Sequence, residues 1–134
     1  MSKLDTIIKD LVIANRILAK EDVVDAYGHV SIRNPDNPKS FFISRSLAPE
    51  LIEKEDIVEL GLDGEPLKNE KRSLYLERFI HAAIYEMRPD INSVVHAHAE
   101  DTLPFGIAAA TKLKMATVVA KRDAKFLRGR IFAP

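Results

Sequence analysis

Three short segments with the character of β-strands follow one another between residues 29 and 60, and a fourth occupies residues 93–95. Residues 29–33 alternate in character, and a turn by composition, Asn-Pro-Asp-Asn-Pro, comes directly after them. Residues 41–43 and 57–60 are mostly apolar, and the later segment is followed by Asp63-Gly64, a strong turn dipeptide. The chain therefore has to build a sheet from short strands.

Two amphipathic helical patterns flank these strands. Residues 3–20 follow the 3.6-residue period, and Ser2 with Asp5 three residues on is an N-cap signal. Residues 75–87 have the same spacing and end at Arg88-Pro89-Asp90, and residues 101–110 start a further helix. The order of helix, three strands, helix, strand and helix predicts a single α/β domain with a mixed sheet covered by helices.

Composition narrows the class of protein. The 134 residues are 46% hydrophobic and 30% charged, which is typical of one globular domain and excludes disordered and fibrous chains. The absence of cysteine removes disulfides, thiol nucleophiles and cysteine zinc sites, and it suits a cytoplasmic location. No apolar run approaches about 20 residues, so we expect no membrane span and no membrane partner.

The net charge of zero hides an asymmetry. Residues 112–134 hold seven basic residues and one acid, whereas the preceding part of the chain is acidic. A basic tail can bind nucleic acid or an anionic membrane. No ladder of aromatic residues accompanies the charge, so we interpret residues 111–134 as an atypical, solvated basic tail and expect no nucleic-acid partner.

The pair His96 and His98 is the first candidate for chemistry. Residues two apart in a strand project from the same face, so both imidazoles can converge on one divalent metal. The alternative is a pair of surface or hydrogen-bonded histidines. The position at the end of an apolar strand, where ligands of α/β sheets bind, favours the metal.

Glu77 and the cluster around Arg45 are the other candidates. Glu77 lies near the start of the second helical pattern, where a solvated or dipole-stabilising acid is the alternative to a functional one, and His81 one turn later suits packing. Arg45, beside Ser44, could bind a carboxylate through two nitrogens, or be a surface arginine in a turn. No phosphate-binding loop, dinucleotide fingerprint or nucleophile elbow is present.

Residues 5–110 resemble the class II aldolase/adducin family in the order and spacing of their motifs. The matching segments are AYGHVSIR at 26–33, FIS at 42–44, EDIV at 55–58, LDG at 62–64, RPD at 88–90 and VVHAH at 94–98. In that family a catalytic glutamate precedes a zinc-binding His-x-His by nineteen residues, as Glu77 precedes His96 here.

The resemblance implies a fold, a site and a partner. It implies a layered α/β/α domain with a mixed sheet, here C-terminally incomplete, and a cyclic homotetramer. It assigns the metal, zinc with manganese or iron as alternatives, to His96 and His98 and catalysis to Glu77. The substrate-binding residues that it implies are Gly28, His29, Ser44 and Arg45.

Departures from the family pattern refine the substrate. Where the sugar-phosphate aldolases have phosphate-binding serines, this chain has Tyr75 and Leu76, and their Gly-Asn-Val-Ser reads Gly-His-Val-Ser here. A phosphate cradle needs small residues with free donors. The resemblance therefore favours the branch of aromatic-acid decarboxylases and related enzymes. No histidine follows His98, so the family's third metal ligand has no counterpart.

We therefore expect a metal-dependent lyase that cleaves a carbon–carbon bond. An aldolase or decarboxylase acting on a small hydroxy- or oxo-acid generates an enolate, whose charge a divalent metal stabilises. The expected partners are a carboxylate-bearing small molecule and further copies of the chain. A non-catalytic, adducin-like scaffold and a truncated copy with little activity are the alternatives.

Overall fold

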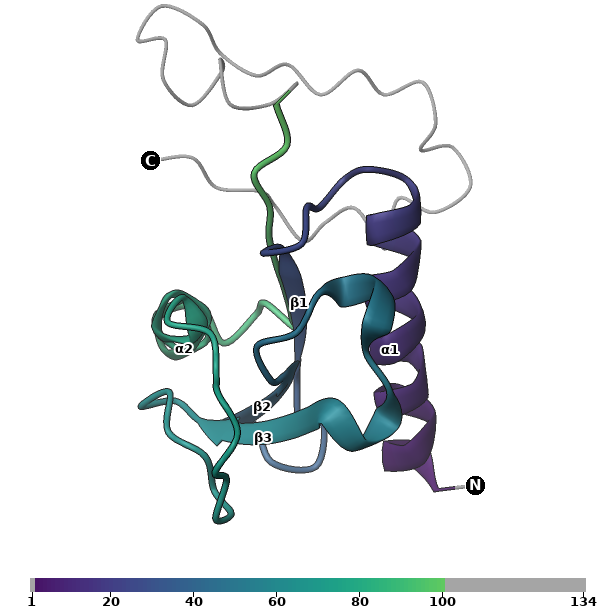
Figure 1. The fold of residues 1–134 in the computed structure, drawn as a ribbon. Helices are drawn as coiled ribbons and strands as arrows, with labels where there is room; N and C mark the ends of the chain where they lie inside the picture. Colours follow the sequence, from purple (N-terminus) through teal and green to yellow (C-terminus); the bar gives the residue numbers. More distant parts are fainter. Residues whose placement is uncertain (1, 101–134) are drawn as a thin grey trace, which may run out of the picture. The chain divides into compact units, whose positions relative to one another are not determined.

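The computed structural model describes residues 2–100, in which helices and strands follow the expected order (Figure 1). The elements are α1 (Lys3–Lys20), β1 (His29–Arg33), β2 (Ser40–Ser44), the short 3-10 helices η1 (Pro49–Leu51) and η2 (Lys54–Asp56), β3 (Ile57–Gly61), α2 (Arg78–Met87) and β4 (Ser93–His96). The four predicted strands and both helices in this range are confirmed, with α2 starting three residues later than predicted. The helix expected at 101–110 and the basic tail lie outside the described residues.

Local signals explain where these elements begin and end. Ser2 accepts a hydrogen bond from the Asp5 amide while Asp5 accepts one from the Ser2 amide, so the predicted cap of α1 is confirmed as a reciprocal capping box. Gly64 has a φ of 79°, in the left-handed region that glycine adopts without strain, and it closes the predicted turn after β3. Among residues 2–100, neither helix is long and apolar enough to cross a membrane.

The sheet has the strand order β3-β2-β1-β4, and every pair within the described residues is antiparallel. Our expectation of a mixed sheet is therefore not met in this part of the chain. The reason is the path between β3 and β4: the chain leaves one edge, passes through α2 and returns at the other edge. There β4 runs against β1, with His29 opposite His96.

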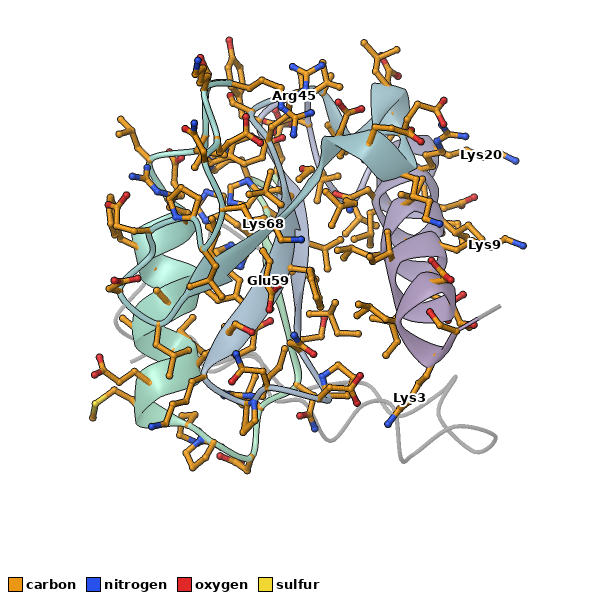
Figure 2. The ribbon with its side chains drawn as sticks, turned by 90° about the horizontal axis from the view of Figure 1, so that it is seen from below. Lys3, Lys9, Lys20, Arg45, Glu59 and Lys68 are labelled. Atoms are coloured by element: carbon orange, nitrogen blue, oxygen red, sulfur yellow. The ribbon has the colours of Figure 1, made fainter. Side chains whose placement is uncertain are left out.

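The two helices contact opposite faces of the sheet (Figure 1). On one face Leu11 of α1 packs with Val30 and Phe42. On the other, residues of α2 join a larger cluster with Phe41, Ile43, Val58, Leu60, Tyr75 and Ile91. Figure 2 shows the outer side of α1, where Lys9 and Lys20 point away from the sheet. The alternation along β1 thus sends its odd-numbered side chains, from His29 to Arg33, toward α2.

The orientation of α2 differs from what its apolar spacing predicts. Ile80 and Met87 are exposed, Met87 by 77%, whereas His81 and Tyr85 are fully buried. The helix carries apolar side chains on most of its circumference, so periodicity cannot choose the inward face. Hydrogen bonds choose it, because Ser31 of β1 contacts Nδ1 of His81 at 2.6 Å and the Tyr85 hydroxyl at 2.8 Å. His81 is a packing histidine, as expected.

Arg33 fastens β1 to the end of α2 and to the turn before β4. Its Nη2 donates to the carbonyl oxygens of Tyr85 at 2.8 Å and Arg88 at 3.1 Å, which lie at the negative end of the α2 dipole. Its Nε donates to Ile91 at 3.0 Å and its Nη1 to Pro38 at 2.6 Å. The guanidinium is buried and has no carboxylate partner among residues 2–100, so these backbone carbonyls and the Tyr85 ring, whose centroid lies 4.8 Å from the guanidinium carbon, compensate its charge.

We predict that Arg33→Lys lowers the free energy of unfolding by about 3 kcal/mol or more, because an ammonium cannot reach four carbonyls in this fan and leaves some of them buried and unpaired. Urea unfolding measures the loss. Arg16→Lys is the matched control: Arg16 also donates to a backbone carbonyl, that of Ile52, but is largely exposed, so we expect a change below about 1 kcal/mol. Equal losses in the two variants would contradict the role given to Arg33.

We also predict that stability falls in acid because of His81. Burial lowers the pKa of His81 from 6.5 to about 3, so between these values the unfolded chain binds a proton that the folded chain does not. The free energy of unfolding then decreases as the pH falls below about 6.5, by up to about 1.4 kcal/mol per pH unit. Urea unfolding at several pH values should give a shallower slope for His81→Asn than for the wild type, and equal slopes in the two proteins would contradict the role given to His81.

Candidate functional site

The candidate site lies where β1 begins and β4 ends, on the face that α2 covers. His29 and His96 are cross-strand partners there, and their ring centroids are 4.9 Å apart. Gly28 permits this approach, since a Cβ at that position would lie 2.4 Å from the Val24 Cβ and 3.2 Å from the His96 carbonyl oxygen. The structure thus gives Gly28 a backbone reason to be glycine, and its contact with a substrate stays a prediction.

His96 and His98 turn their imidazoles toward one point. Their Nε2 atoms are 3.1 Å apart, and the rings meet edge to face. Two nitrogens bound to one tetrahedral zinc lie about 3.3 Å apart, given bonds of about 2.0–2.1 Å, so this separation suits a shared metal as well as an N–H···N hydrogen bond. Among residues 2–100, no third histidine or carboxylate joins them in a group able to hold a metal. The pair therefore offers two donors.

Asp25 orients the outer of these two imidazoles. Its Oδ2 lies 3.1 Å from Nδ1 of His98, and its Oδ1 accepts the amide hydrogen of Tyr27 at 2.9 Å. The hydrogen bond from His98 holds the pKa of the Asp25 carboxyl below its ordinary value. Sequence reasoning missed Asp25, because the 73 residues that separate it from His98 leave no signal of the contact in a single sequence.

His29 forms the buried centre of the site. Its Nδ1 lies 3.0 Å from the Tyr27 carbonyl oxygen, which can only accept, so this nitrogen carries the proton. Its ring stacks on Tyr75 at 4.1 Å and on His81 at 4.9 Å. Burial lowers the pKa of His29, against the effect of the nearby Glu77 charge, so the ring is neutral and its Nε2 holds a lone pair. That Nε2, like that of His81, has no hydrogen-bond partner among the described residues.

Glu77 immediately precedes α2 as its N-cap residue. Its side chain makes no capping hydrogen bond and is half-buried. The charge of Glu77 raises the pKa of the His29 imidazole, against the larger effect of burial. The Glu77 carboxylate is therefore not used to cap α2, and its catalytic role stays a prediction.

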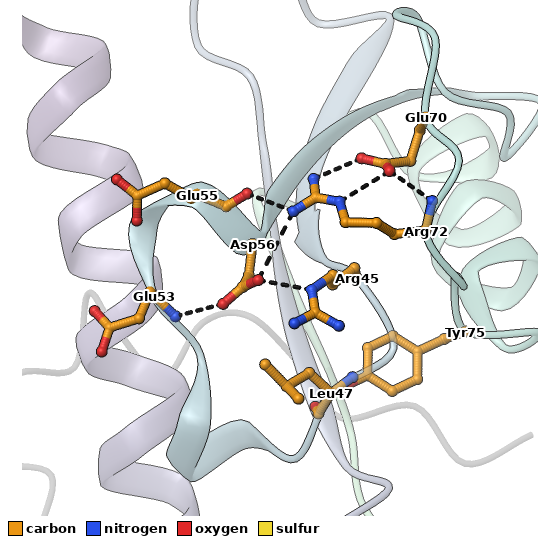
Figure 3. A network of polar contacts seen from close by, with 8 residues as sticks. All are labelled: Arg45, Leu47, Glu53, Glu55, Asp56, Glu70, Arg72 and Tyr75. Atoms are coloured by element: carbon orange, nitrogen blue, oxygen red, sulfur yellow. Dashed lines mark hydrogen bonds and ion pairs between the residues drawn. The ribbon is translucent and has the colours of Figure 1, made fainter.

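The structure places Ser44 and Arg45, both predicted to bind substrate, on opposite faces of the sheet. Arg45 follows β2 on the α2 face, and continuing the β1–β2 register by two residues puts it opposite His29. Its Nε donates to Oδ1 of Asp56 at 2.7 Å, within a network that includes Arg72 and is drawn in Figure 3. Ser44 points to the other face, alternating with Arg45, and its buried hydroxyl has no partner among residues 2–100.

Tyr75 packs against His29 and is hydrogen-bonded to the backbone of Leu47. Its ring lies against His29, and its hydroxyl donates to the carbonyl oxygen of Leu47, whose amide lies 3.2 Å from the same hydroxyl (Figure 3). Leu76, the next residue, is 78% exposed. The Tyr75 ring therefore fills space beside the site, and its hydroxyl is hydrogen-bonded to the backbone.

Comparisons with known proteins identify the family of this chain. The match to the class II aldolase and adducin N-terminal domain extends over residues 9–132. The chain is 47% identical over 93 residues to decarboxylase tropJ of Talaromyces stipitatus, covering 68% of this chain and 35% of that protein. It is 30% identical to an L-fuculose phosphate aldolase of Methanocaldococcus jannaschii, with 65% and 45% covered. The matched region thus spans less than half of each of these relatives.

Solved structures show the same relationship. An L-fuculose 1-phosphate aldolase from Glaciozyma antarctica superposes with a TM-score of 0.65 at 28% identity, covering 74% of this chain and 42% of that one. An aldolase II superfamily protein from Pseudomonas syringae gives a TM-score of 0.65 at 27% identity, covering 74% and 41%. With its sequence motifs, its helix-and-sheet fold and these matches, the chain belongs to the class II aldolase and adducin N-terminal domain family.

Proposed function

We propose that this domain carries the metal site of a carbon–carbon lyase, an aldolase or a decarboxylase, that acts on a small hydroxy- or oxo-acid. The observation that carries the proposal is the convergence of the His96 and His98 Nε2 atoms beside the buried His29. The names of the relatives, a decarboxylase and L-fuculose phosphate aldolases, support the class of reaction. Both reactions break a bond to a carbon that becomes an enolate.

His96 and His98 would hold the divalent metal as neutral imidazoles. Imidazole donors suit zinc, and also manganese or iron. When bound, the cation stabilises the negative charge of the enolate oxygen. The separation of the two Nε2 atoms fits this donor set, and a third ligand has to come from outside the group of residues described here.

The neighbouring side chains divide the remaining tasks. Glu77, whose carboxylate is free of capping bonds, takes up or returns the proton at the reacting carbon or oxygen. His29 accepts a hydrogen bond from a substrate hydroxyl, because its Nε2 has a lone pair and no other partner among residues 2–100. Arg45 binds the substrate carboxylate through its Nη atoms, since Asp56 holds only its Nε.

A carboxylate fits the site better than a sugar phosphate. A phosphate needs several free donors around it, and Tyr75 commits its hydroxyl to the Leu47 carbonyl while Leu76 has none to offer. The side chain of His29, held neutral by burial, accepts rather than donates at Nε2. Arg45 is then the cation that selects an acid, and Ser44 has no access from its position on the other face.

Association with further copies is part of the proposal. Large apolar residues are exposed on α2, namely Phe79, Ile80 and Met87, and on the segment just before it, Leu76. Exposed apolar patches of this kind mark interaction surfaces, and a cytoplasmic homo-oligomer agrees with the family. The second candidate function is a non-catalytic, adducin-like scaffold, favoured by one observation: no third donor completes a metal site among residues 2–100.

We predict that the 134-residue chain binds zinc, but more weakly than about 1 µM, because a catalytic zinc takes three protein ligands and two histidines are at hand. Calorimetric titration with zinc measures the affinity, and His96→Asn should abolish the heat of binding. Submicromolar binding of one zinc per chain that survives Glu77→Ala would show a complete site and contradict the prediction. No binding at all would favour the scaffold.

We predict that Glu77→Gln lowers kcat by about 10²–10⁴ on any small hydroxy- or oxo-acid that the zinc-loaded protein cleaves, because the amide cannot carry the proton. Release of carbon dioxide or of an aldehyde from a panel of such acids is the assay. Glu86→Gln is the matched control, since Glu86 is an exposed acid on the same helix, and it should leave kcat unchanged. Full activity of Glu77→Gln would remove Glu77 from the mechanism.

A further inference from the structure

We propose that Asp25 is a positioning residue, which holds His98 in the Nδ1–H tautomer and turns its Nε2 lone pair toward Nε2 of His96. The inference rests on the metal site of the proposed function and adds a residue to it. Asp25 acts through His98 rather than as a ligand, because its Oδ2 contacts Nδ1 of His98, whereas the nitrogen that faces His96 is Nε2.

The backbone brings Asp25 to this place by two contacts. The amide of Gly28 donates to the Asp25 carbonyl at 3.1 Å, which closes a turn directly before β1. Gly28 also lies close to the backbone of His96, because a Cβ on Gly28 would be 3.2 Å from the His96 carbonyl oxygen. The turn therefore packs against the end of β4. A carboxylate at residue 25 therefore faces the residue that follows β4 by two positions, His98.

Hydrogen-bond chemistry then sets the tautomer. An ionised carboxylate only accepts, so the nitrogen of His98 that lies 3.1 Å from Asp25 Oδ2 must carry a proton. In a neutral imidazole the other nitrogen, Nε2, then carries a lone pair. This Nε2 lies 3.1 Å from Nε2 of His96. The same turn also fixes the tautomer of His29, because Nδ1–H of His29 donates a hydrogen bond to the Tyr27 carbonyl oxygen. The turn before β1 thus leaves a lone pair on Nε2 of His98 and another on Nε2 of His29.

The contact serves orientation more than stability. The side chains of Asp25 and His98 are 47% and 46% exposed, and ion pairs this exposed contribute about 0–1 kcal/mol to folding. Carboxylates that accept the second N–H of a metal-binding histidine have a larger effect on the metal, and their loss weakens metal affinity about 10–100-fold. Removal of Asp25 should therefore change the metal site while the fold persists.

Asp25→Asn is the sharpest test. The Tyr27 amide requires an acceptor, so the amide oxygen of the new side chain stays there and its NH2 group takes the place beside His98 Nδ1. A donor at that place demands a lone pair on Nδ1, which moves the proton of His98 to Nε2, the nitrogen meant for the metal. Glu21→Gln is the matched control: it makes the same acid-to-amide change at an exposed residue near the end of α1.

Two measurements on the full chain decide the matter. Long-range proton–nitrogen NMR spectra of the metal-free protein, assigned with single histidine variants, should show His98 as Nδ1–H in the wild type and in Glu21→Gln, and as Nε2–H in Asp25→Asn. Calorimetric titration with zinc should show affinity at least tenfold weaker for Asp25→Asn alone. Urea unfolding should differ by less than about 1 kcal/mol among the three proteins.

The possible outcomes separate this inference from the proposed function. A wild type that takes up no zinc overturns the metal site itself, and the NMR spectra still show whether Asp25 sets the tautomer. A wild type that binds zinc, with Asp25→Asn within twofold of it, overturns the role of Asp25 alone. An unchanged His98 tautomer in Asp25→Asn does the same.

Discussion

The buried guanidinium of Arg33 is the contact on which the arrangement of this domain depends. It donates to four backbone carbonyls, two at the end of α2 and one in the turn before β4, so it fixes where the helix stops and where the last strand starts. The register of β4 against β1 follows from this placement, and the register puts His96 beside His29. Arg33, at the end of β1, thereby sets the geometry of the candidate site at the beginning of the same strand.

Between that cation and the candidate site, the α2 face of the sheet is polar to an unusual degree. Ser31 joins His81 and Tyr85 in one hydrogen-bonded group, and His29 stacks against His81. Two imidazole nitrogens remain buried without a partner among the described residues, and each such group costs about 1–3 kcal/mol. Unsatisfied groups that persist in a folded protein are concentrated at functional positions. Here they gather next to the pair of histidines that converge, on the α2 face of the sheet.

Much of the fold could be predicted from the sequence because its signals are local. The cap of α1, the turn at Gly64 and the limits of the strands depend on residues within a few positions of one another. Strand periodicity predicts the approach of His96 and His98, but β4 ends at His96, so the placement of His98 also depends on its contact with Asp25. The inward face of α2 and the antiparallel sheet were not predictable in this way, since they depend on Ser31, Arg33 and the pairing of β1 with β4. Asp25 escaped notice for the same reason, because its partner is set by tertiary structure alone.

The pairing of β1 with β4 has a consequence for the order of events during synthesis. Asp25 and His29 leave the ribosome early, and 73 residues separate Asp25 from the histidine that it contacts. Within the described residues β4 lies at the edge of the sheet beside the first strand made, so the nascent chain lacks His96 and His98 of the candidate site until residue 98 has emerged. Contacts between distant segments form slowly, because closing the intervening loop costs entropy before it is rewarded. A nascent or partly folded chain therefore keeps His29 apart from His96 and His98 until β4 has paired with β1.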